Sequence, residues 1–273
     1  MKLYEKEQKL TKSIKGNGKV AVAFSGGVDS TLLLKECVDT LGCENVIAIT
    51  ACSLAFPERE KTEAQELCNQ LGVKQVMFDI NQLDIPGFAQ NPPNRCYLCK
   101  KALFKGICYI AKANGCRWIA EGSNLDDLDD YRPGMQAIKE LGVSSPLQEA
   151  GLTKAEIREL SARHSLPTYS KQSFACLATR LEYGDTITDE KLEKIGNAEQ
   201  FLLDMGFEQV RVRLHSNSAD IEVAPHQRKM LLDNADKITN AQLSHPHQAE
   251  RLQQCIESGR TRLCRRSRSC GSS

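Results

Sequence analysis

The chain has 273 residues, of which 41% are apolar and 26% charged, enough for a buried core and one or two domains. Lys and Arg number 36 against 35 Asp and Glu, so the net charge of +1 gives no general attraction to nucleic acid or to a membrane surface. No apolar run approaches the roughly 18 residues of a membrane span, and the charged N-terminus MKLYEKEQKLTK lacks the apolar core of a signal peptide. We therefore expect a cytoplasmic protein.

Up to about residue 147, apolar strand patterns alternate with amphipathic helix patterns. Strands are predicted at 20–24, 45–51, 75–80 and 117–123, and helices at 30–42, 57–72 and 97–115. Gly42 and Gly72 close two of these helices, and Pro57 stands in the first turn of one. This order predicts an α/β fold with a doubly wound parallel sheet. Ligands bind such sheets at the carboxyl ends of the strands.

A second, smaller domain is predicted after the sheet. Thr153 and Glu156 form the pattern of a capping box at the start of a further helix. Residues 170–184 (SKQSFACLATRLEYG) show neither helical nor strand periodicity and are interpreted as a functional loop. A helix, a hairpin and another helix are predicted at 188–206, 209–225 and 226–238. The domain hypothesis is therefore an α/β sheet domain over 1–180, a small α+β domain over 181–240, and an Arg- and Ser-rich, disordered or atypical tail over 241–273.

The stretch VAVAFSGGVDSTLLLKE joins a buried strand to a leucine-rich helix through Ser25-Gly26-Gly27. Glycine lets the backbone turn sharply and approach a ligand closely, and the free N–H groups of the following helix create an anion site. Ser25 and Ser30 add hydroxyl donors, and Asp29 is placed to hold Mg²⁺ on the phosphates of a nucleotide. A tight β-α connection is the structural alternative. The complete Ser-Gly-Gly-x-Asp-Ser pattern favours phosphate binding.

This SGGVDS segment resembles the PP-loop of the ATP pyrophosphatases. The resemblance of the chain to that family covers roughly residues 15 to 180. The resemblance implies an enzyme that binds ATP, cleaves it between the α and β phosphates, and adenylates a carbonyl or carboxylate oxygen. Adenylation turns a poor leaving group into a good one, after which nitrogen or sulfur can attack. The stretch is not a Walker A loop, because no Gly-Lys-Ser/Thr follows at that spacing.

Three of the twelve cysteines do not fit the apolar pattern of a core. Cys37, Cys68 and Cys108 lie within amphipathic patterns and read as small core hydrophobes. The three that do not fit are Cys96, Cys99 and Cys176. Cys96 and Cys99 open a helix after a Pro-rich turn, and Cys176 lies in the loop FACLATR. Three thiolates with one open position suit a 4Fe-4S cluster. A structural zinc, with His164 or Cys116 as the fourth ligand, and the absence of any metal are the alternatives.

Three further segments, EGSNLDDLDDYRPG (121–134), FACLATR (174–180) and VRVRLHS (210–216), resemble the LarE family of ATP-dependent sulfur transferases of nickel-pincer nucleotide biosynthesis. The resemblance implies that the substrate is pyridinium-3,5-biscarboxylic acid mononucleotide, whose carboxylates are adenylated and become thiocarboxylic acids. Family members with three cysteines imply a 4Fe-4S cluster on Cys96, Cys99 and Cys176, carrying an extra sulfide from a sulfide donor. Members with a single cysteine, at the position of Cys176, sacrifice its sulfur instead. We also expect a homo-oligomer.

Several charged residues suit such a substrate. Arg211 and Arg213 lie on one face of a predicted strand and can fork onto a phosphate, although a solvated strand face is the alternative. Arg180 is placed to hold a carboxylate or the adenylate near Cys176, and Glu222 to fix an arginine or a metal. Four acidic residues between 126 and 130 suit magnesium binding and simple solvation equally. Asp130 and Arg132 could pair only with each other and shape the loop.

Other functions compete with this hypothesis. A tRNA thiolase can combine a PP-loop with three cysteines, but the near-zero net charge argues against long contact with RNA. An amide-forming synthetase leaves the cysteines unexplained, and a cluster-bearing, nucleotide-binding redox sensor would not be an enzyme. The chain also departs from the LarE family after about residue 240, where we expect an apolar closing strand and find six arginines and two acidic residues in a polar segment.

Overall fold

The computed structural model describes residues 1–53, 56–128, 133–172, 175–215 and 218–242. It divides the chain into two compact units, Met1–Ala175 and a second unit that begins at Cys176. The division falls inside the aperiodic loop at 170–184, a few residues before the boundary expected after residue 180. Each unit is described below by itself.

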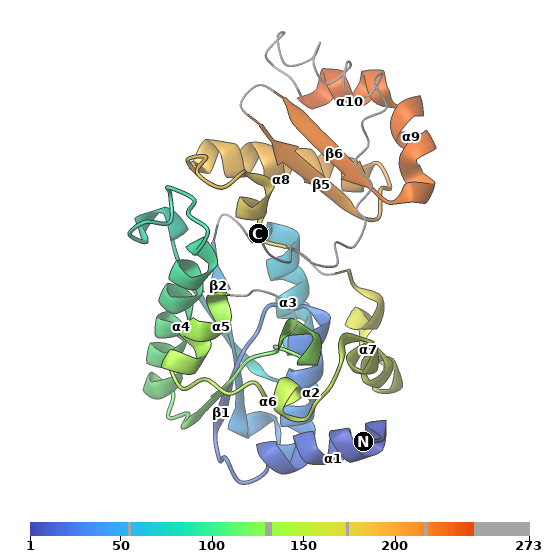
Figure 1. Cartoon of the computed structure of the whole chain (residues 1–273). Helices are drawn as coiled ribbons and strands as arrows, with labels where there is room; N and C mark the ends of the chain where they lie inside the picture. Colours follow the sequence, from blue (N-terminus) through green and yellow to red (C-terminus); the bar gives the residue numbers. More distant parts are fainter. Residues whose placement is uncertain (54–55, 129–132, 173–174, 216–217, 243–273) are drawn as a thin grey trace, which may run out of the picture. The chain divides into compact units, whose positions relative to one another are not determined.

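The first unit is built on a parallel sheet of four strands (Figure 1). They are β1 (Val20–Ala23), β2 (Val46–Cys52), β3 (Lys74–Asp79) and β4 (Trp118–Ala120), in the order β3-β2-β1-β4. The predicted α/β parallel sheet is therefore confirmed. The chain runs outward from β1 to β2 and β3 and then returns to the other side of β1. The carboxyl ends of β1 and β4 thus define the switch point, where such sheets bind ligands.

Seven helices accompany this sheet in the described part of the first unit: α1 (Leu3–Ile14), α2 (Val28–Leu41), α3 (Glu58–Gln70), α4 (Arg95–Ala113), α5 (Pro133–Glu140), α6 (Pro146–Glu149) and α7 (Lys154–Arg163). The predicted capping box of α7 is confirmed, since Thr153 Oγ1 accepts from the Glu156 N–H and the Glu156 carboxylate accepts from the Thr153 N–H. Helix α2 begins two residues earlier than expected, because Gly27 takes the extended N-cap conformation. Asp29 and Ser30 therefore lie inside the first turn of α2.

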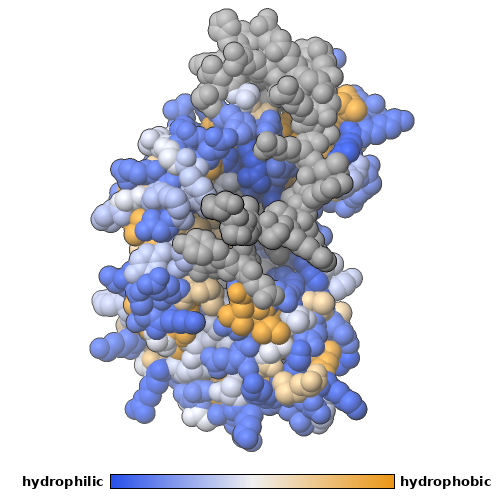
Figure 2. All heavy atoms as spheres, viewed as in Figure 1, coloured by the Kyte–Doolittle hydropathy of each residue, from blue (hydrophilic) through white to orange (hydrophobic). Residues whose placement is uncertain are grey.

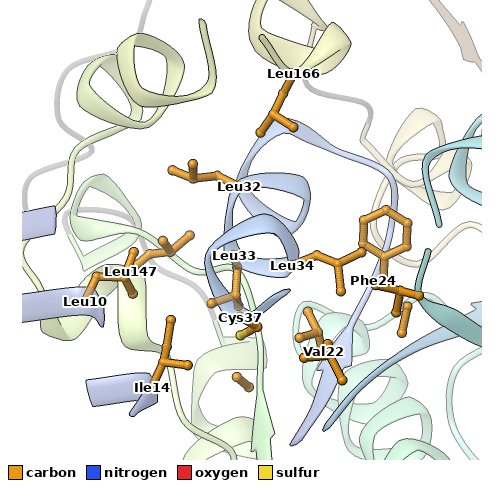
Figure 3. Packing of buried hydrophobic residues seen from close by; sticks show 14 of the residues in the cluster. Leu10, Ile14, Val22, Phe24, Leu32, Leu33, Leu34, Cys37, Leu147 and Leu166 are labelled. Carbon is orange, nitrogen blue, oxygen red and sulfur yellow. The ribbon is translucent and has the colours of Figure 1, made fainter. Parts of the chain in front are cut away.

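Apolar clusters cover both faces of the sheet. One joins β1 to α2, with Leu34 turned toward Phe24 (Figure 3), and it includes residues of α1, α6 and the segment around Leu166. The other packs α4 and α5 against the opposite face. Cys37 and Cys68 are core residues, as predicted, and burial raises the pKa of both thiols, that of Cys68 to about 12. These clusters hold the strand ends and the first turn of α2 in fixed positions.

The second unit contains α8 (Asp189–Asp204), the hairpin β5 (Val210–Leu214) and β6 (Ala219–Val223), and then α9 (Arg228–Asp233) and α10 (Ala235–Gln242). The hairpin is antiparallel and places Arg211 opposite Glu222 and Arg213 opposite Asp220. Its apolar face packs with α8 and α9 around Phe207 and Leu231. Two helices replace the single one predicted at 226–238, because Asn234 leaves the helical conformation. The tail was expected from residue 241, but α10 extends to Gln242, and the rest of the tail, from position 243, lies outside the described residues.

On the face drawn in Figure 2, hydrophilic residues cover most of the coloured surface and apolar residues form small separate groups. Among the helices of the described residues, none combines the length and the apolar composition needed to span a bilayer.

Candidate functional site

The segment after β1 forms a tight turn into α2. Gly26 has a φ of 69°, a left-handed backbone conformation that favours glycine. It is also packed closely, because a Cβ at this position would lie 3.2 Å from the Cβ of Ala64 in α3. A side chain at Gly26 is therefore opposed both by its backbone conformation and by its neighbour. The turn leaves the first N–H groups of α2 at the carboxyl end of β1, where they can bind an anion.

Hydroxyl groups close this turn. The Ser30 Oγ donates to the Gly27 carbonyl at 3.1 Å, accepts from the Ser25 N–H at 3.4 Å and lies 3.2 Å from the Ser25 Oγ. The Thr31 Oγ1 also donates to the Gly27 carbonyl, at 2.9 Å. Ser30 is buried and Ser25 exposed. Ser30 thus shapes the loop, while the Ser25 hydroxyl is accessible to a ligand.

Asp29 is held by two residues that the sequence did not indicate. Its Oδ1 accepts from the Asn124 Nδ2 at 3.2 Å, and its Oδ2 pairs with the Lys154 Nζ. Asn124 follows β4 and Lys154 is the first residue of α7, so the three side chains meet at the switch point between β1 and β4. A carboxylate beside a lysine and next to free helix N–H groups can bind Mg²⁺ and phosphate together. The capping box at Thr153 and Glu156 predicted that a helix starts near Lys154, but it could not predict that the Lys154 side chain contacts Asp29.

The segment after β4 positions Asn124. The buried Glu121 carboxylate accepts from the N–H and Oγ of Ser123 and from the Ser145 Oγ. A Cβ on Gly122 would lie 3.0 Å from the Ser30 backbone nitrogen, so this segment runs against the first turn of α2. That close approach explains why β4 ends at Ala120 although a strand was expected to continue to 123.

The acidic segment after Asn124 makes hydrogen bonds within the protein. The Asp127 Oδ2 accepts from the Asn124 N–H at 3.0 Å, and the Asp126 Oδ2 accepts from the Lys154 N–H at 2.9 Å. These contacts hold the two residues that contact Asp29. Asp129, Asp130 and Arg132, also considered for this loop, lie outside the described residues.

Lys171 lies on the other side of the phosphate loop. Its Nζ donates to the Gly26 carbonyl at 3.3 Å and pairs with Glu60 at 2.8 Å and Glu63 at 2.5 Å. Both glutamates belong to α3. Lys171 therefore ties the start of the aperiodic loop 170–184 to the phosphate loop, a contact 145 positions long that no local pattern could reveal.

Two of the three singled-out cysteines lie in the first turns of α4. Cys96 is exposed, whereas Cys99 is buried and its Sγ accepts a hydrogen bond from the Gln82 Nε2 at 2.9 Å. Residues three apart on a helix share one face, so the two sulfur atoms can reach a common ligand. Amide donors to sulfur suit a cysteine that binds metal as a thiolate.

Cys176, the third of them, opens the second unit. It precedes a short 3-10 helix at Leu177–Arg180 and is partly exposed, and its carbonyl accepts from the N–H and Oγ1 of Thr179 at 2.9 and 2.8 Å. The two residues considered as additional zinc ligands have other surroundings. Cys116 is buried in the apolar cluster of α4 and α5, and His164 lies 3.1 Å from Glu36.

Arg180 forms a buried ion pair. Its Nε and a terminal nitrogen donate to the two carboxylate oxygens of Glu199 at 2.6 and 3.3 Å, and its second terminal nitrogen donates to the Thr179 Oγ1 at 2.8 Å. The Glu199 Oε1 also accepts from the Val212 N–H at 2.9 Å. Arg180 and Glu199 are 3% and 5% exposed, so this pair joins the segment after Cys176 to α8 and β5.

The two strand arginines differ in their contacts. Arg213 pairs with Glu222 through its Nε at 2.7 Å and donates to the Thr179 carbonyl at 3.2 Å. Arg211 lies on the same face of β5, half-buried, and pairs with no acidic group among the described residues. Glu222 thus fixes an arginine, one of the two roles considered for it. The face retains a guanidinium that can bind an anion.

The parallel sheet and its Ser-Gly-Gly-x-Asp-Ser turn define the class: residues 4–94 match the NAD synthase family, a PP-loop class of ATP-using enzymes. Over 221 residues the chain is 36% identical to the pyridinium-3,5-bisthiocarboxylic acid mononucleotide synthase of Lactiplantibacillus plantarum, covering 81% of this chain and 80% of the relative. It is 43% identical over 206 residues, 76% of each chain, to an uncharacterized protein of Synechocystis sp.. An uncharacterized protein of Methanocaldococcus jannaschii is 30% identical over 226 residues, 81% of this chain and 84% of its own.

The chain belongs to the family of the pyridinium-3,5-bisthiocarboxylic acid mononucleotide synthase, that is, the LarE family within the NAD synthase-like class. It is thus an enzyme of the ATP-dependent, sulfur-transferring type. The resemblance based on the EGSNLDDLDDYRPG, FACLATR and VRVRLHS segments is confirmed, and so is the broader PP-loop resemblance of SGGVDS.

Proposed function

We propose that the protein adenylates the carboxylates of pyridinium-3,5-biscarboxylic acid mononucleotide and converts them to thiocarboxylates, for synthesis of the nickel-pincer nucleotide. One observation carries the proposal. The phosphate loop meets Asp29, Asn124 and Lys154 at the switch point of the sheet, in a chain that shares 36% identity with a bisthiocarboxylic acid mononucleotide synthase over 81% of its length.

The reaction has two steps. A carboxylate oxygen of the substrate attacks the α-phosphorus of ATP, the bond to the β-phosphate oxygen breaks, and pyrophosphate leaves. A sulfide then attacks the carbon of the acyl adenylate and AMP leaves with the oxygen, which yields the thiocarboxylate. The first step places negative charge on the departing pyrophosphate, so it needs cations and N–H donors at the phosphates.

The first unit supplies these groups. The N–H groups of the turn and of the first turn of α2 bind phosphate oxygens, with the Ser25 hydroxyl as a further donor. Gly26 and Gly27 allow the nucleotide to approach the backbone, and Ser30 keeps the turn closed. Asp29 supplies the oxygen ligand that Mg²⁺ requires, and Lys154 adds a positive charge at the same point.

In the second unit we assign the substrate phosphate to Arg211 and Arg213. Glu222 holds the guanidinium of Arg213 in a fixed orientation, and Arg211 pairs with no carboxylate in the part of the chain that the structure describes. The two carboxylate contacts of Arg180 favour a positioning role, because Arg180 anchors the short helix after Cys176 to Glu199. Fixed arginines bind phosphate with less loss of conformational entropy than mobile ones.

For the sulfur we propose a 4Fe-4S cluster held by Cys96, Cys99 and Cys176. The residues fit the group: soft thiolates select iron–sulfur centres over hard cations, Cys96 and Cys99 are one turn apart on α4, and the Gln82 amide donates to the Cys99 sulfur. When bound by three thiolates, such a cluster leaves one iron open for a sulfide from a separate donor. In the alternative, the sulfur of Cys176 itself is transferred.

Turnover assays test the adenylation step. The protein should release pyrophosphate and AMP from ATP and Mg²⁺ only when the pyridinium substrate is present, and the product should carry sulfur by mass spectrometry. Asp29→Ala should abolish pyrophosphate release, whereas Asp39→Ala, which removes an exposed carboxylate of the same helix, should not. Pyrophosphate release by Asp29→Ala at the parent rate would refute the phosphate-loop assignment.

Anaerobic purification with iron and sulfide assays tests the sulfur source. Replacing Cys96, Cys99 or Cys176 singly by Ala should remove the visible absorption of the cluster and repeated sulfur transfer while adenylation persists. Cys43→Ala, at an exposed free cysteine, is the matched control. A Cys96→Ala/Cys99→Ala variant with full multiple-turnover activity contradicts the cluster, and loss of one hydrogen sulfide mass from Cys176 after a single turnover identifies sacrifice instead.

A further inference from the structure

A histidine and two glutamates from three helices converge outside the candidate nucleotide site described above. Glu7 comes from α1, Glu36 from α2 and His164 from the C-cap of α7. One donor atom of each lies within 4.8 Å of the other two. The cluster therefore joins α7 to two helices near the start of the chain, and neither the proposed nucleotide site nor the proposed cysteine site uses it.

The buried member of this cluster has an unmet polar atom. Glu36 is 4% exposed, and within the described part of the chain neither its Oε1 nor the His164 Nε2 makes a hydrogen bond. The two atoms nevertheless lie 3.1 Å apart. They approach each other without the alignment of a hydrogen bond. Two ligand atoms of one metal ion show this arrangement, because both point at the ion and not at each other.

The distances between the ligand atoms of the cluster agree with a shared metal ion. Ligands about 2.0–2.1 Å from a tetrahedral zinc ion lie about 3.3–3.4 Å from one another. The His164 Nε2 is 3.1 Å from the Glu36 Oε1 and 3.6 Å from the Glu7 Oε1, values on either side of this separation. The pair of carboxylates and one imidazole is a donor set that zinc and related ions accept.

Charge also favours a cation here. Two carboxylates face one imidazole, and one of the two, that of Glu36, is buried. The neighbouring lysines pair elsewhere, Lys6 with Glu156 and Lys35 with Asp39. A divalent ion would neutralise the cluster, because a buried carboxylate requires a partner charge.

We propose that Glu7, Glu36 and His164 form a binding site for a divalent transition-metal ion of the zinc class, which holds α1 against α2 and α7. The side chains of Glu7 and His164 are 26% and 25% exposed, so an ion can enter from solvent and a water molecule can complete the coordination. Calcium and magnesium are less suited, because they require more oxygen ligands and do not favour imidazole.

Metal titration of the full chain tests the site. After treatment with a chelator, the protein is titrated with Zn²⁺ alone, and bound metal is measured directly. Glu36→Gln should bind one ion fewer per chain than the parent, or bind that ion at least about 100-fold more weakly. Glu159→Gln, which changes an exposed glutamate of α7, should match the parent.

Cobalt separates this site from the cysteines. Co²⁺ bound by imidazole and carboxylates shows visible bands without the intense thiolate charge-transfer absorption, so the spectrum should contain such a component and lose it in Glu36→Gln. Zn²⁺ should also raise the melting temperature of the parent by more than that of the variant. If Glu36→Gln does not fold, Glu7→Gln decides, since Glu7 is partly exposed. Zinc binding with equal stoichiometry and equal affinity in the parent and the folded variant, or a purely thiolate cobalt spectrum, overturns the proposal.

Discussion

We assign anion binding to two regions that would act by different means, the phosphate loop of the first unit and the arginine face formed by Arg211 and Arg213 in the second. In the phosphate loop, backbone N–H groups point into a turn that Gly26 and Ser30 close. On the arginine face, the binding groups are the guanidiniums of Arg211 and Arg213, and the Glu222 carboxylate holds that of Arg213 in place. A site built from backbone depends on the conformation of a few residues. A site built from side chains needs further charged residues to orient it.

The largest effect on activity is expected at Gly26, because anion binding in the phosphate loop depends on the backbone conformation of this turn. Gly26→Val should reduce adenylation by about 1,000-fold or more, because the positive φ and the 3.2 Å approach to Ala64 both oppose a side chain. Pyrophosphate release measures it. Gly72→Val is the control: Gly72 has a φ of 67° but open space around its Cβ position, so it should lose stability and keep activity. Equal activity in the two variants would show that the loop does not require close backbone approach.

Removing a partner from the buried pair in the second unit should have the next largest effect, on stability. Arg180→Ala leaves the Glu199 carboxylate buried without its counter-charge and should lower the free energy of unfolding by about 3–5 kcal/mol. Chemical denaturation measures this. Arg163→Ala breaks an exposed pair with Glu159 and should cost less than about 1 kcal/mol. Similar costs for the two variants would mean that Arg180 is not an internal anchor.

The strand arginines should differ in a binding titration. Arg211→Ala should weaken binding of the mononucleotide by about 1.5–3 kcal/mol, the magnitude of a charge-assisted hydrogen bond, and leave ATP binding nearly unchanged. Arg213→Ala should add a loss of stability, because Glu222 loses its partner. The exposed Lys194→Ala in α8 is the control. Equal loss of both ligands in Arg211→Ala would indicate disruption of the unit instead.

A smaller effect is expected from the capping box that positions Lys154. Burial raises the pKa of Glu156, but hydrogen bonds from Lys6 and Thr153 outweigh it, so the pKa is lowered overall. Its contribution to stability is therefore present above the unfolded pKa of about 4.3 and disappears as pH falls through the lower folded value.

Glu156→Gln should accordingly reduce stability by about 0.5–1 kcal/mol at neutral pH and flatten the acid side of the stability profile. Denaturation midpoints between pH 3 and 7 measure this, with Glu159→Gln as the reference. An unchanged acid slope in Glu156→Gln would show that the carboxylate is not stabilised in the folded protein.

The sequence by itself determined the features that depend on neighbouring residues. Apolar runs and caps located the four strands and the helices between them, and the Ser-Gly-Gly-x-Asp-Ser turn located the phosphate loop. Periodicity and capping act within a few residues, so they can be read along the chain. The ends of some predicted strands and helices differ from the observed ones. Gly122 packs on Ser30, and β4 ends early; Asn234 divides the last predicted helix into two.

Only the tertiary structure decided which side chains meet. Asp29 contacts Asn124 and Lys154, which lie 95 and 125 positions away, and Lys171 reaches Gly26 across 145 positions. The pairing of Arg180 with Glu199 and the convergence of Glu36 with His164 are of the same kind. A charged residue carries no local mark of its partner, because the pairing depends on how strands and helices pack. Burial then determines whether such a pair is a solvated surface contact or a fixed part of a site.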